Sequence, residues 1–388
     1  MPHIDKTTNI LDTLLREKAD AYLIIGNSND ADLYFTTEFL AFDQFSYIQT
    51  KQTKEILLVS SMELGRARNE SRIANILTLE DCNFRERMKE TGDSARTYAE
   101  CLGQVLQKEG VRTVCVPYDF PYYTAQVLKE NGFSVTTTKS PFERIRAVKA
   151  KEEVSLIRGV QKACEKAMET AIETIRNAEV RDDVLYSGDK ILTSETVRYI
   201  IEKTLLEHGC EADSTIVACG KGSSNPHWAG EGALLLNEPI VIDIFPRHKI
   251  HRYYADMTRT VLKGEASEKL ADMYEAVKAA QEAAFKILKD GVLASEVHSA
   301  VCDEFKTRGY DVGTTKGFMH STGHGVGLEI HELPAVSNMD MALETGNVIT
   351  IEPGLYYPGI GGVRLEDMVV ITETGYENLT RFPKQFVV

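Results

Sequence analysis

Four acidic residues stand inside apolar, strand-like stretches of the C-terminal half of the chain, where a solvated surface would not place them. They are Asp243 in PIVIDIF, Asp256 in YYADMTRTV, Glu352 after VITI, and Glu366 in VRLEDMVVI. Because a desolvated carboxylate is costly unless a cation compensates for it, each must pair with a base or bind a metal ion. Pairing with the nearby Arg259 or Arg364 would explain any one of them alone. Two arginines cannot neutralise four buried acids.

Three histidines lie in segments whose neighbours leave an imidazole accessible for chemistry. His324 lies between Gly323 and Gly325, His331 follows seven residues later, and His227 precedes the only tryptophan. Each of these histidines, taken alone, is more often a structural or an exposed residue. We keep that interpretation for the other six, which are His3, His208, His248, His251, His298 and His320.

Two aspartates, two glutamates and one histidine make an oxygen-rich set of donors with a single nitrogen. Such a set suits a pair of divalent cations such as Mn, Co or Zn, with carboxylates bridging them, rather than a structural zinc held by thiolates. Two metal ions about 3.5–4 Å apart can hold a hydroxide between them and polarise a carbonyl group. The set therefore indicates a hydrolase with two metal ions.

Two well-known sequence motifs are each excluded by a single residue. The stretch ACGKGSSN lacks the first glycine of a phosphate-binding P-loop, because Thr215 stands in its place. The pair His331-Glu332 lacks the second histidine of a zincin helix, because Ala335 stands there. Neither a dinucleotide-binding glycine fingerprint nor a G-x-S-x-G nucleophile elbow occurs.

The elements that must position these residues divide near residue 145. Up to about residue 140, short apolar runs alternate with segments of helical periodicity, which is typical of an α/β domain with a helix-covered sheet. The predicted strands there are 21–25, 55–60, 111–117 and 133–137, and the predicted helices are 95–108 and 122–130. A long amphipathic helix beyond the basic stretch 144–151 opens a second domain. We therefore predict domains at 1–145 and 146–388.

The second domain mixes helices and strands without regular alternation. Its predicted helices are 194–208, 267–290 and 294–308, and its predicted strands are 215–219, 239–245, 253–262, 348–357 and 363–372. These strands are short and rich in Val, Ile and Tyr, which favours buried sheet. The pattern predicts an α+β domain built around a curved antiparallel sheet.

The composition argues against several kinds of partner. The chain has 44 Lys plus Arg against 58 Asp plus Glu, a formal net charge of −14, so we expect it to bind neither nucleic acid nor an anionic membrane surface. Its uncharged apolar runs are all shorter than the roughly 18–20 residues that cross a bilayer, and charges interrupt the first 25 residues, where a signal peptide would be apolar. Seven dispersed cysteines without a C-x-x-C pair favour a reducing compartment, so we expect a cytoplasmic protein.

The strings around the acids and histidines resemble those of a known family. The motifs YYADMTRT, STGHGVGLEIHE, IEPGLYY and VRLED look like those of the pita-bread-fold metallopeptidases, which include methionine aminopeptidase, Xaa-Pro aminopeptidase and prolidase. A sizeable N-terminal domain ending in ERIRAVKAKEEVSLIR is similar to the Xaa-Pro aminopeptidase and prolidase branch. Creatinase shares that creatinase-like N-terminal domain and the two-domain design, but it hydrolyses a guanidino compound without metal.

The resemblance implies a ligand role for each of five residues. Asp243 would chelate one metal ion, and His324 and Glu352 would chelate the other. Asp256 and Glu366 would bridge the two ions. The resemblance thus implies two divalent ions, with Mn expected and Co or Zn as alternatives.

The same resemblance implies roles in catalysis and in substrate binding. Glu352 would take a proton from the bridging water and pass it on. His227 and His331 resemble two histidines that bind the scissile peptide and steady the developing oxyanion. Arg364 matches a position that orients ligands and the substrate carboxylate.

The activity implied is hydrolysis of the Xaa-Pro bond of a proline-containing peptide, in a dipeptide or in a longer peptide. The resemblance also implies a homodimer, in which the N-terminal domain reaches over a neighbouring subunit's pocket. The candidate lid is the loop TTEFLAFDQFSY, with Phe39, Phe42, Phe45 and Tyr47. The alternatives are a creatinase-like C–N hydrolase of a small metabolite and a non-catalytic peptide-binding protein on the same fold.

The chain departs from the family pattern at two points. Phe245 stands where the family usually has glycine, and Asp243 and Asp256 are thirteen residues apart instead of the usual eleven. We expect a longer hairpin that still aims both carboxylates inward, because an odd separation plus a turn can preserve strand register. The consequence expected is an altered pocket rim.

Overall fold

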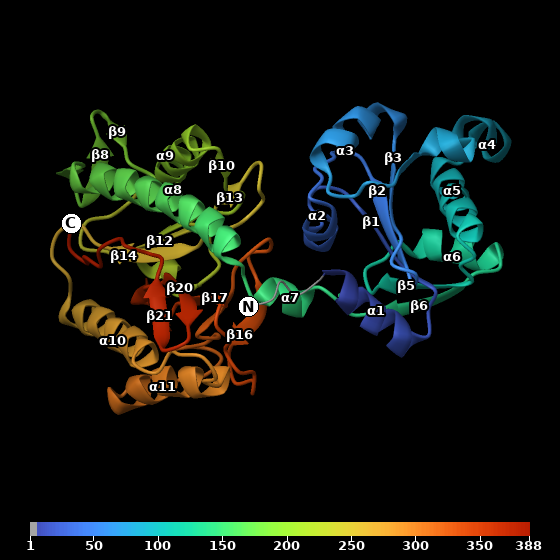
Figure 1. Cartoon of the computed structure of the whole chain (residues 1–388). Coiled ribbons are helices and arrows are strands. Elements are labelled where there is room, and N and C mark those ends of the chain that lie inside the picture. Colours follow the sequence, from blue (N-terminus) through green and yellow to red (C-terminus); the bar gives the residue numbers. More distant parts are fainter. Residues whose placement is uncertain (1–5) are drawn as a thin grey trace. The chain divides into compact units, whose positions relative to one another are not determined.

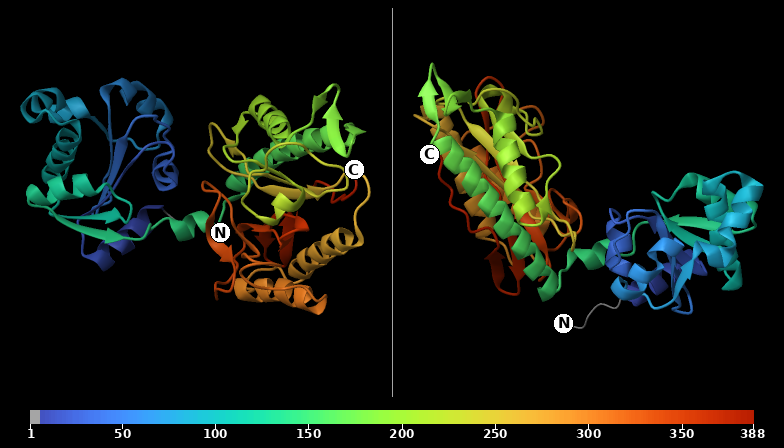
Figure 2. Two further views of the ribbon diagram at one scale, coloured as in Figure 1. Left: turned by 180° about the vertical axis from the view of Figure 1, so that it is seen from behind. Right: turned by 90° about the horizontal axis from the view of Figure 1, so that it is seen from above.

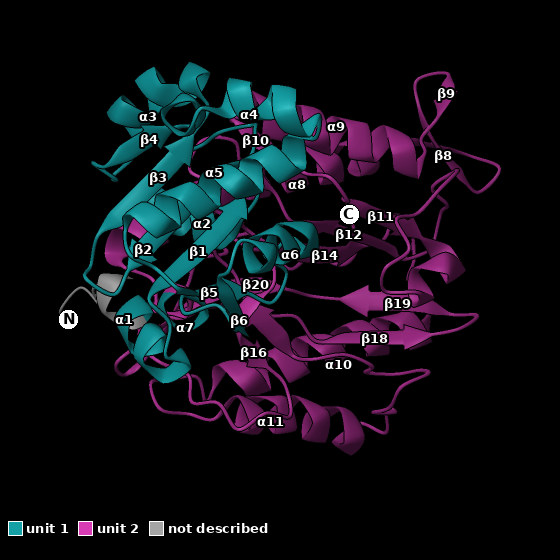
Figure 3. Cartoon of the chain, turned by 90° about the vertical axis from the view of Figure 1, so that its right-hand side faces the viewer, with its two compact units in different colours: residues 1–145 teal, residues 146–388 magenta. Residues whose placement is uncertain are grey.

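The structure, a computed structural model, describes residues 6–388, with side chains from Ile10 onward, so that His3 lies outside the described residues. The chain forms two compact units, one that ends at Ile145 and one that spans Arg146–Val388 (Figure 3). Within residues 6–388, no helix combines the length and the apolar character needed to cross a membrane.

A mixed six-stranded sheet forms the centre of the first unit (Figure 1). Its order is β4-β3-β2-β1-β5-β6, in which β1 pairs antiparallel with β2 and parallel with β5. Leu23, Ile48 and Leu58 of the sheet share one apolar core with Leu102 and Leu106. The strands are β1 Ala21–Gly26, β2 Phe45–Thr50, β3 Glu55–Val59, β4 Ile76–Thr78, β5 Thr113–Pro117 and β6 Ser134–Thr138. The helices are α1 Lys6–Glu17, α2 Ala31–Thr37, α3 Leu64–Glu70, α4 Phe84–Thr91, α5 Ser94–Lys108 and α6 Tyr122–Glu130.

The aromatic segment expected to form a lid belongs largely to this core. Phe39 and Phe45 are buried and meet edge to face at 5.4 Å between ring centroids, and Tyr47 is buried within β2. Phe42 alone among the four is exposed, at 92%. The lid prediction is therefore wrong for three of the four aromatic residues, because burying large rings against the sheet stabilises the unit more than leaving them in solvent.

Two layers of helices enclose the strands of the second unit, with α8 and α9 on one side and α10 and α11 on the other (Figures 1 and 2). The predicted amphipathic helix is α8, whose Ile157, Val160, Ala163, Ala167 and Ala171 are buried while Val154 is partly buried. The short helix α7 joins the two units. The helices are α7 Glu143–Ala147, α8 Lys151–Arg176, α9 Ser194–Glu207, α10 Glu268–Phe285 and α11 Ala294–Thr307.

Two antiparallel sheets lie between those helices. One has the order β11-β12-β14, and the other has the order β16-β15-β17-β20-β21. The strands are β11 Ile216–Cys219, β12 Ile240–Ile244, β14 Met257–Val261, β15 Gly323–Gly325, β16 Glu332–Val336, β17 Val348–Ile351, β20 Asp367–Thr372 and β21 Gly375–Asn378. Three smaller groups complete the unit: β7 Glu179–Arg181, β8 Val184–Ser187 and β9 Lys190–Ile191; β10 Cys210–Glu211 with β13 Arg247–His248; and β18 Gly354–Tyr357 with β19 Gly361–Arg364. The predicted class, an α/β unit followed by an α+β unit with antiparallel sheets, is confirmed.

Two strands predicted as continuous are each divided in two. The segment 348–357 breaks between β17 and β18 at Glu352, and the segment 363–372 breaks between β19 and β20 at Glu366. At the breaks the backbone changes partner, because Glu352 N donates to Thr322 O and Glu366 N donates to Thr258 O. Pro353 has no N–H to continue the first ladder. Both glutamates thus lie where the chain passes from one sheet to another.

Candidate metal centre

The five predicted ligands come from five different places in the second unit. Asp243 lies in β12 and His324 in β15, while Asp256 immediately precedes β14. Glu352 and Glu366 occupy the two strand breaks. Asp243, Asp256 and Glu366 are at most 8% exposed, so that the apolar flanks seen in the sequence do correspond to burial.

The structure gathers three of these residues most tightly. Asp256, His324 and Glu366 each offer a ligand atom, and these atoms lie within 4.8 Å of one another. His324 Nε2 is 3.6 Å from Asp256 Oδ2 and 3.3 Å from Glu352 Oε1, so Glu352 joins the group through the imidazole. Asp243 is held differently, because its Oδ2 accepts a hydrogen bond from Arg364 Nη2 at 2.5 Å.

The backbone around His324 determines which ring nitrogen faces the acids. His324 Nδ1 lies 3.1 Å from Gly325 O and donates its proton to that carbonyl, which leaves Nε2 directed at the carboxylates. His324 N donates to Thr350 Oγ1 at 3.0 Å, which fixes the strand. An imidazole oriented through its other nitrogen is the usual arrangement of a histidine metal ligand.

Burial and mutual repulsion change the pKa values of the acids. Burial, followed by the charges of Glu366 and Asp243, raises the pKa of Asp256 well above its usual range. Burial, followed by Glu352 and Asp243, raises the pKa of Glu366 to about 8. Burial also raises the pKa of Asp243, although Arg364 opposes it. Crowded carboxylates of this kind favour a cation in their midst.

Glu352 and His324 behave as a charged pair. Burial alone would raise the pKa of Glu352, but the hydrogen bond and charge of His324 lower it to about 2. Burial alone would lower the pKa of His324, but the hydrogen bond and charge of Glu352 raise it to about 9. At neutral pH, and with no cation between them, Glu352 is therefore a carboxylate and His324 an imidazolium.

The donor set fits divalent cations. Asp243 Oδ1 and Asp256 Oδ1 are buried without a hydrogen-bond partner in the part of the chain that the structure describes. A buried carboxylate oxygen left unpaired is costly, and a cation would satisfy it. With four carboxylates and one imidazole, the set has the oxygen-rich chemistry of Mn or a similar ion rather than that of a thiolate zinc site.

Arg364 is the centre of a hydrogen-bond network behind Asp243. Its Nε donates to Thr258 Oγ1 at 3.0 Å, and its Nη1 donates to Tyr356 OH at 2.9 Å. Thr258 Oγ1 in turn donates to Glu366 Oε2 at 2.7 Å. Arg364 thus links Asp243 to Glu366 through Thr258.

His320, which the sequence analysis left as a structural histidine, lies at the end of this network. Its Nδ1 is 2.8 Å from Ser321 O and its Nε2 is 3.2 Å from Tyr356 OH. Nδ1–H therefore donates to Ser321, and Tyr356 donates its hydroxyl proton to Nε2. The spacing of His320 four residues before His324, and of Tyr356 four residues after Glu352, is the signal that could have identified both.

A buried glutamine holds both strand breaks from α10. Gln281 is 0% exposed, and its Nε2 donates to Ile351 O at 2.7 Å and to Leu365 O at 3.3 Å. These carbonyls directly precede Glu352 and Glu366. No sequence motif marks Gln281, because its role depends on contacts 70 and 84 residues away.

Both predicted substrate histidines are exposed, His331 beside His324 and His227 in its own loop. The His331 ring lies 4.3 Å from the His324 ring, at 71° between their planes, and burial followed by the charge of His324 lowers the pKa of His331. His227 is exposed in its loop, where its N–H donates to Asn225 Oδ1 at 3.2 Å. The residue before it, Pro226, accepts a hydrogen bond from Arg364 Nη1 at 3.5 Å, so this loop lies beside the network that holds Asp243.

An ion cluster fixes the loop that carries His331. Lys149 Nζ is 2.5 Å from Glu332 Oε1, and Arg146 Nη2 is 3.4 Å from Glu332 Oε2. These three side chains are at most 4% exposed. A Cβ at Gly327 would lie 2.2 Å from Glu332 Oε1 and would displace this carboxylate from the cluster. The neighbour of His331 is thereby tied to the start of the second unit.

The longer hairpin between Asp243 and Asp256 folds back on itself. Ala255 N donates to Pro246 O, and Tyr254 N donates to Gly327 O at 2.8 Å. Its turn contains His248 and His251, whose rings stack at 3.8 Å, and β13 pairs with β10. Both aspartates remain buried, at 8% and 4% exposed, and the hairpin contacts the glycine-rich loop beyond His324.

Comparison with known families agrees with this geometry. Residues 155–373, more than half of the chain, match the model of Metallopeptidase family M24. The chain belongs to metallopeptidase family M24. Residues 6–148 of this metallopeptidase match the Creatinase/Prolidase N-terminal domain. The predicted resemblance to the pita-bread metallopeptidases of the Xaa-Pro aminopeptidase and prolidase branch is therefore confirmed.

Individual relatives of this family M24 protein agree with the assignment. An Xaa-Pro dipeptidase of Pyrococcus furiosus is 38% identical over 248 residues, which cover 63% of this chain and 66% of the relative. The structure of the prolidase from Pyrococcus horikoshii matches with a TM-score of 0.82 and 29% identity, over 98% of this chain and 99% of that one. The X-Pro aminopeptidase from Thermotoga maritima matches with a TM-score of 0.79 and 26% identity, over 97% and 100%.

Proposed function

We propose that this metallopeptidase hydrolyses the Xaa-Pro bond of dipeptides, as a prolidase does. The observation that carries the proposal is the buried cluster of Asp256, His324 and Glu366 with Glu352 beside it, in a chain similar over nearly its full length to a prolidase structure. Asp243, whose Oδ1 is buried without a hydrogen-bond partner among the described residues, completes the set. An intact ligand set is evidence against a non-catalytic binding protein and against metal-free creatinase-type chemistry.

Each ligand has a proposed place in holding two divalent ions. Asp243 would chelate one ion, His324 and Glu352 would chelate the other, and Asp256 and Glu366 would bridge them. When bound, such ions supply a nucleophile at neutral pH and polarise the peptide carbonyl. The residues of the chain must then manage protons, charge and orientation.

We propose Glu352 as the residue that moves the proton. As a carboxylate beside a bound cation, Glu352 would take a proton from water and give it to the departing proline nitrogen. A tertiary amide nitrogen is a poor leaving group unless it is protonated. His331 and His227 would donate hydrogen bonds to the carbonyl oxygen as negative charge develops on it.

Arg364 would act chiefly on the ligands. Four of its five N–H groups face Thr258, Tyr356, Asp243 and, at 3.5 Å, Pro226 O, which leaves one on Nη2 for the substrate carboxylate. This count supports the double role expected from the sequence, in which Arg364 orients Asp243 and also binds substrate.

Three finer assignments belong to the same proposal. Mn is the proposed ion, because oxygen-rich sets of this kind suit it. A homodimer is proposed from the family resemblance, with the exposed Phe42 as the aromatic residue available to reach a neighbouring subunit. The cytoplasm is proposed because all seven cysteines, each within the described residues, are free and buried.

The test compares peptides with the purified enzyme and Mn. Cleavage of Xaa-Pro dipeptides without cleavage of Xaa-Pro-Xaa tripeptides is expected; the reverse would make the enzyme an aminopeptidase, and cleavage of neither would refute the proposal. Turnover of a small amidino metabolite that survives EDTA would favour the creatinase-type alternative. His324→Ala should abolish turnover and lower metal content, whereas His208→Ala, at an exposed position, should change neither.

A further inference from the structure

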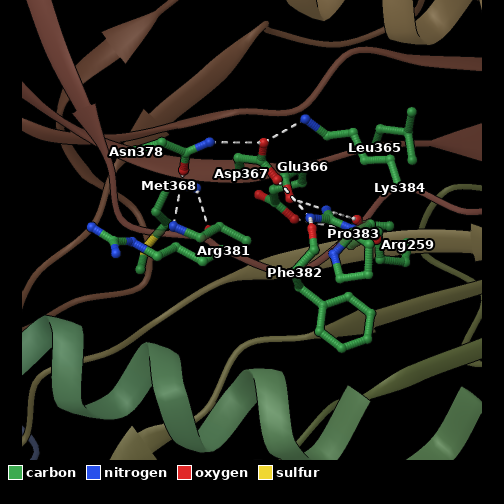
Figure 4. A network of polar contacts seen from close by, with 12 residues as sticks. Arg259, Leu365, Glu366, Asp367, Met368, Asn378, Arg381, Phe382, Pro383 and Lys384 are labelled. Carbon is green, nitrogen blue, oxygen red and sulfur yellow. Dashed lines mark hydrogen bonds and ion pairs between the residues drawn. The ribbon is translucent and has the colours of Figure 1, made fainter. Parts of the chain in front are cut away.

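The most thoroughly bonded side chain of the second unit is not a predicted ligand. Arg259 is 1% exposed, and all five of its N–H groups have acceptors. Nη1 donates to Thr258 O at 2.9 Å and to Glu366 O at 2.7 Å. Nη2 donates to Asp367 Oδ1 at 2.8 Å and to Phe382 O at 2.7 Å, and Nε donates to Pro383 O at 3.1 Å. One guanidinium therefore joins the strand break at Glu366 to the C-terminal segment (Figure 4).

The C-terminal segment supplies a second cation to Asp367, in addition to Arg259 of β14. Lys384 Nζ donates to Asp367 Oδ2 at 2.6 Å, and Asn378 Nδ2 donates to the same oxygen at 3.2 Å. Asp367 is 1% exposed and lies beside the proposed bridging ligand Glu366. The carboxylate is thus held between Arg259 on one oxygen and Lys384 on the other, as Figure 4 shows.

The position of Arg259 in β14 explains why this contact bears on the metal centre. Successive side chains of a strand point to opposite faces. Thr258, the residue before Arg259, therefore faces the other way, and its hydroxyl group donates a hydrogen bond to Glu366 Oε2. Glu366 N donates to Thr258 O, and Glu366 O accepts from Arg259. The peptide groups on both sides of Glu366 and its carboxylate are therefore all fixed by two adjacent residues of β14.

The C-terminal segment is itself anchored to α8 and β20. Arg381 N donates to Glu165 Oε1 at 2.6 Å, and Gln161 Nε2 donates to Thr380 Oγ1 at 3.1 Å. Met368 N donates to the same threonine hydroxyl at 2.9 Å. Residues 382–384 therefore approach Arg259 from a fixed starting point.

We propose that residues 382–384 are a positioning element of the metal centre, which acts through Arg259 and Asp367 to hold Glu366 in place for metal binding. This inference rests on the proposed metallopeptidase function and adds to it a part of the chain that contains no ligand. Lys384 is a positioning residue, because it reaches the metal centre only through Asp367. Residues that orient metal ligands from outside typically change metal affinity about 10- to 100-fold when they are lost.

The test measures Mn binding by isothermal titration calorimetry on full-length protein stripped with chelator. Lys384→Met removes the ammonium but keeps the stem, and we expect the Mn dissociation constant to rise about tenfold. Asp367→Asn should raise it by a similar or larger factor. Lys384→Arg keeps a cation at this position, so its Mn dissociation constant should stay close to that of the unchanged protein. Gln385→Ala is the matched control, because among the described residues the Gln385 amide donates only to Val387 O.

Thermal unfolding of each variant separates positioning from a general loss of stability. A lower unfolding temperature with an unchanged dissociation constant for Lys384→Met would overturn the proposal, as would a Gln385→Ala effect equal to that of Lys384→Met. If Asp367→Asn does not fold, Lys384→Met and Lys384→Arg decide alone, since Lys384 is partly exposed. The binding measurement needs no substrate, so a protein that binds Mn but cleaves no Xaa-Pro peptide would refute the proposed function and leave this test intact.

Discussion

The ion cluster beside His331 makes an asymmetric prediction about stability. Glu332→Gln leaves two buried cations, of which Arg146 retains Glu329 and Lys149 loses its carboxylate. Lys149→Met instead leaves Glu332 with Arg146 at 3.4 Å. Breaking a buried pair so that a charge remains uncompensated costs about 3–5 kcal/mol. We expect about 4 kcal/mol of destabilisation for Glu332→Gln and about 2 kcal/mol for Lys149→Met.

Thermal unfolding followed by circular dichroism measures this difference. For a unit of this size, each kcal/mol lowers Tm by about 2–4 °C, so Glu332→Gln should lower it by about 8–16 °C. The control is Lys166→Met, because the Lys166–Glu169 pair is about half exposed and should contribute at most about 0.5 kcal/mol. Because His331 adjoins Glu332, kcat should also fall by about tenfold in the folded variant.

Two results would refute this reasoning. Equal Tm values for Glu332→Gln and Lys166→Met would mean that the buried cluster contributes no more than an exposed pair. A larger loss for Lys149→Met than for Glu332→Gln would mean that Arg146 does not compensate Glu332 at 3.4 Å. Either outcome would contradict the account of how the His331 loop is fixed.

Three further predictions concern the metal centre. Tyr356→Phe removes an acceptor of Arg364, so kcat should fall about 10- to 100-fold with unchanged circular dichroism; unchanged kcat would contradict the network. In chelated protein, the pKa values of Glu366 and His324 are raised to about 8 and about 9, so the protonated forms of both groups stabilise the fold. This contribution is complete below about pH 4.5 for Glu366 and about pH 6.5 for His324, and Tm should fall as pH rises toward 8 and 9. A Tm that rises over this range would contradict the assignment. EDTA should abolish peptide cleavage and lower Tm, and added Mn should restore both, because the ions bind only the folded state.

The sequence predicted those features that depend on the types of residue present and on their local pattern. Carboxylates within apolar stretches predicted burial; Asp243, Asp256 and Glu366 are buried, and Glu352 is partly buried. The alternation of elements predicted the α/β unit, and the loss of regular alternation after residue 145 predicted the antiparallel α+β unit. The individual roles of the site residues stay predictions, since contact geometry alone does not assign them.

The parts that sequence reasoning missed depend on distant contacts. Glu352 and Glu366 lie in apolar runs that look like single strands, and only partners such as Thr322 and Thr258 show that the strands break there. Phe45 looked like part of a loop, because the sheet that buries it is assembled from residues far along the chain. Arg259 looked like a possible partner for a metal-binding acid, yet it binds Asp367 and carbonyl groups instead.

The single amide of Gln281 has a consequence for how the metal centre can change. Because it holds the carbonyls before both Glu352 and Glu366, the two glutamate backbones form one mechanical unit with α10. A shift of that helix would therefore be transmitted to both glutamates at once. Substitutions in the core around α10 should move the two glutamates together before they alter the spacing between them. Selection for a different metal ion could act through that helix without replacing a single ligand.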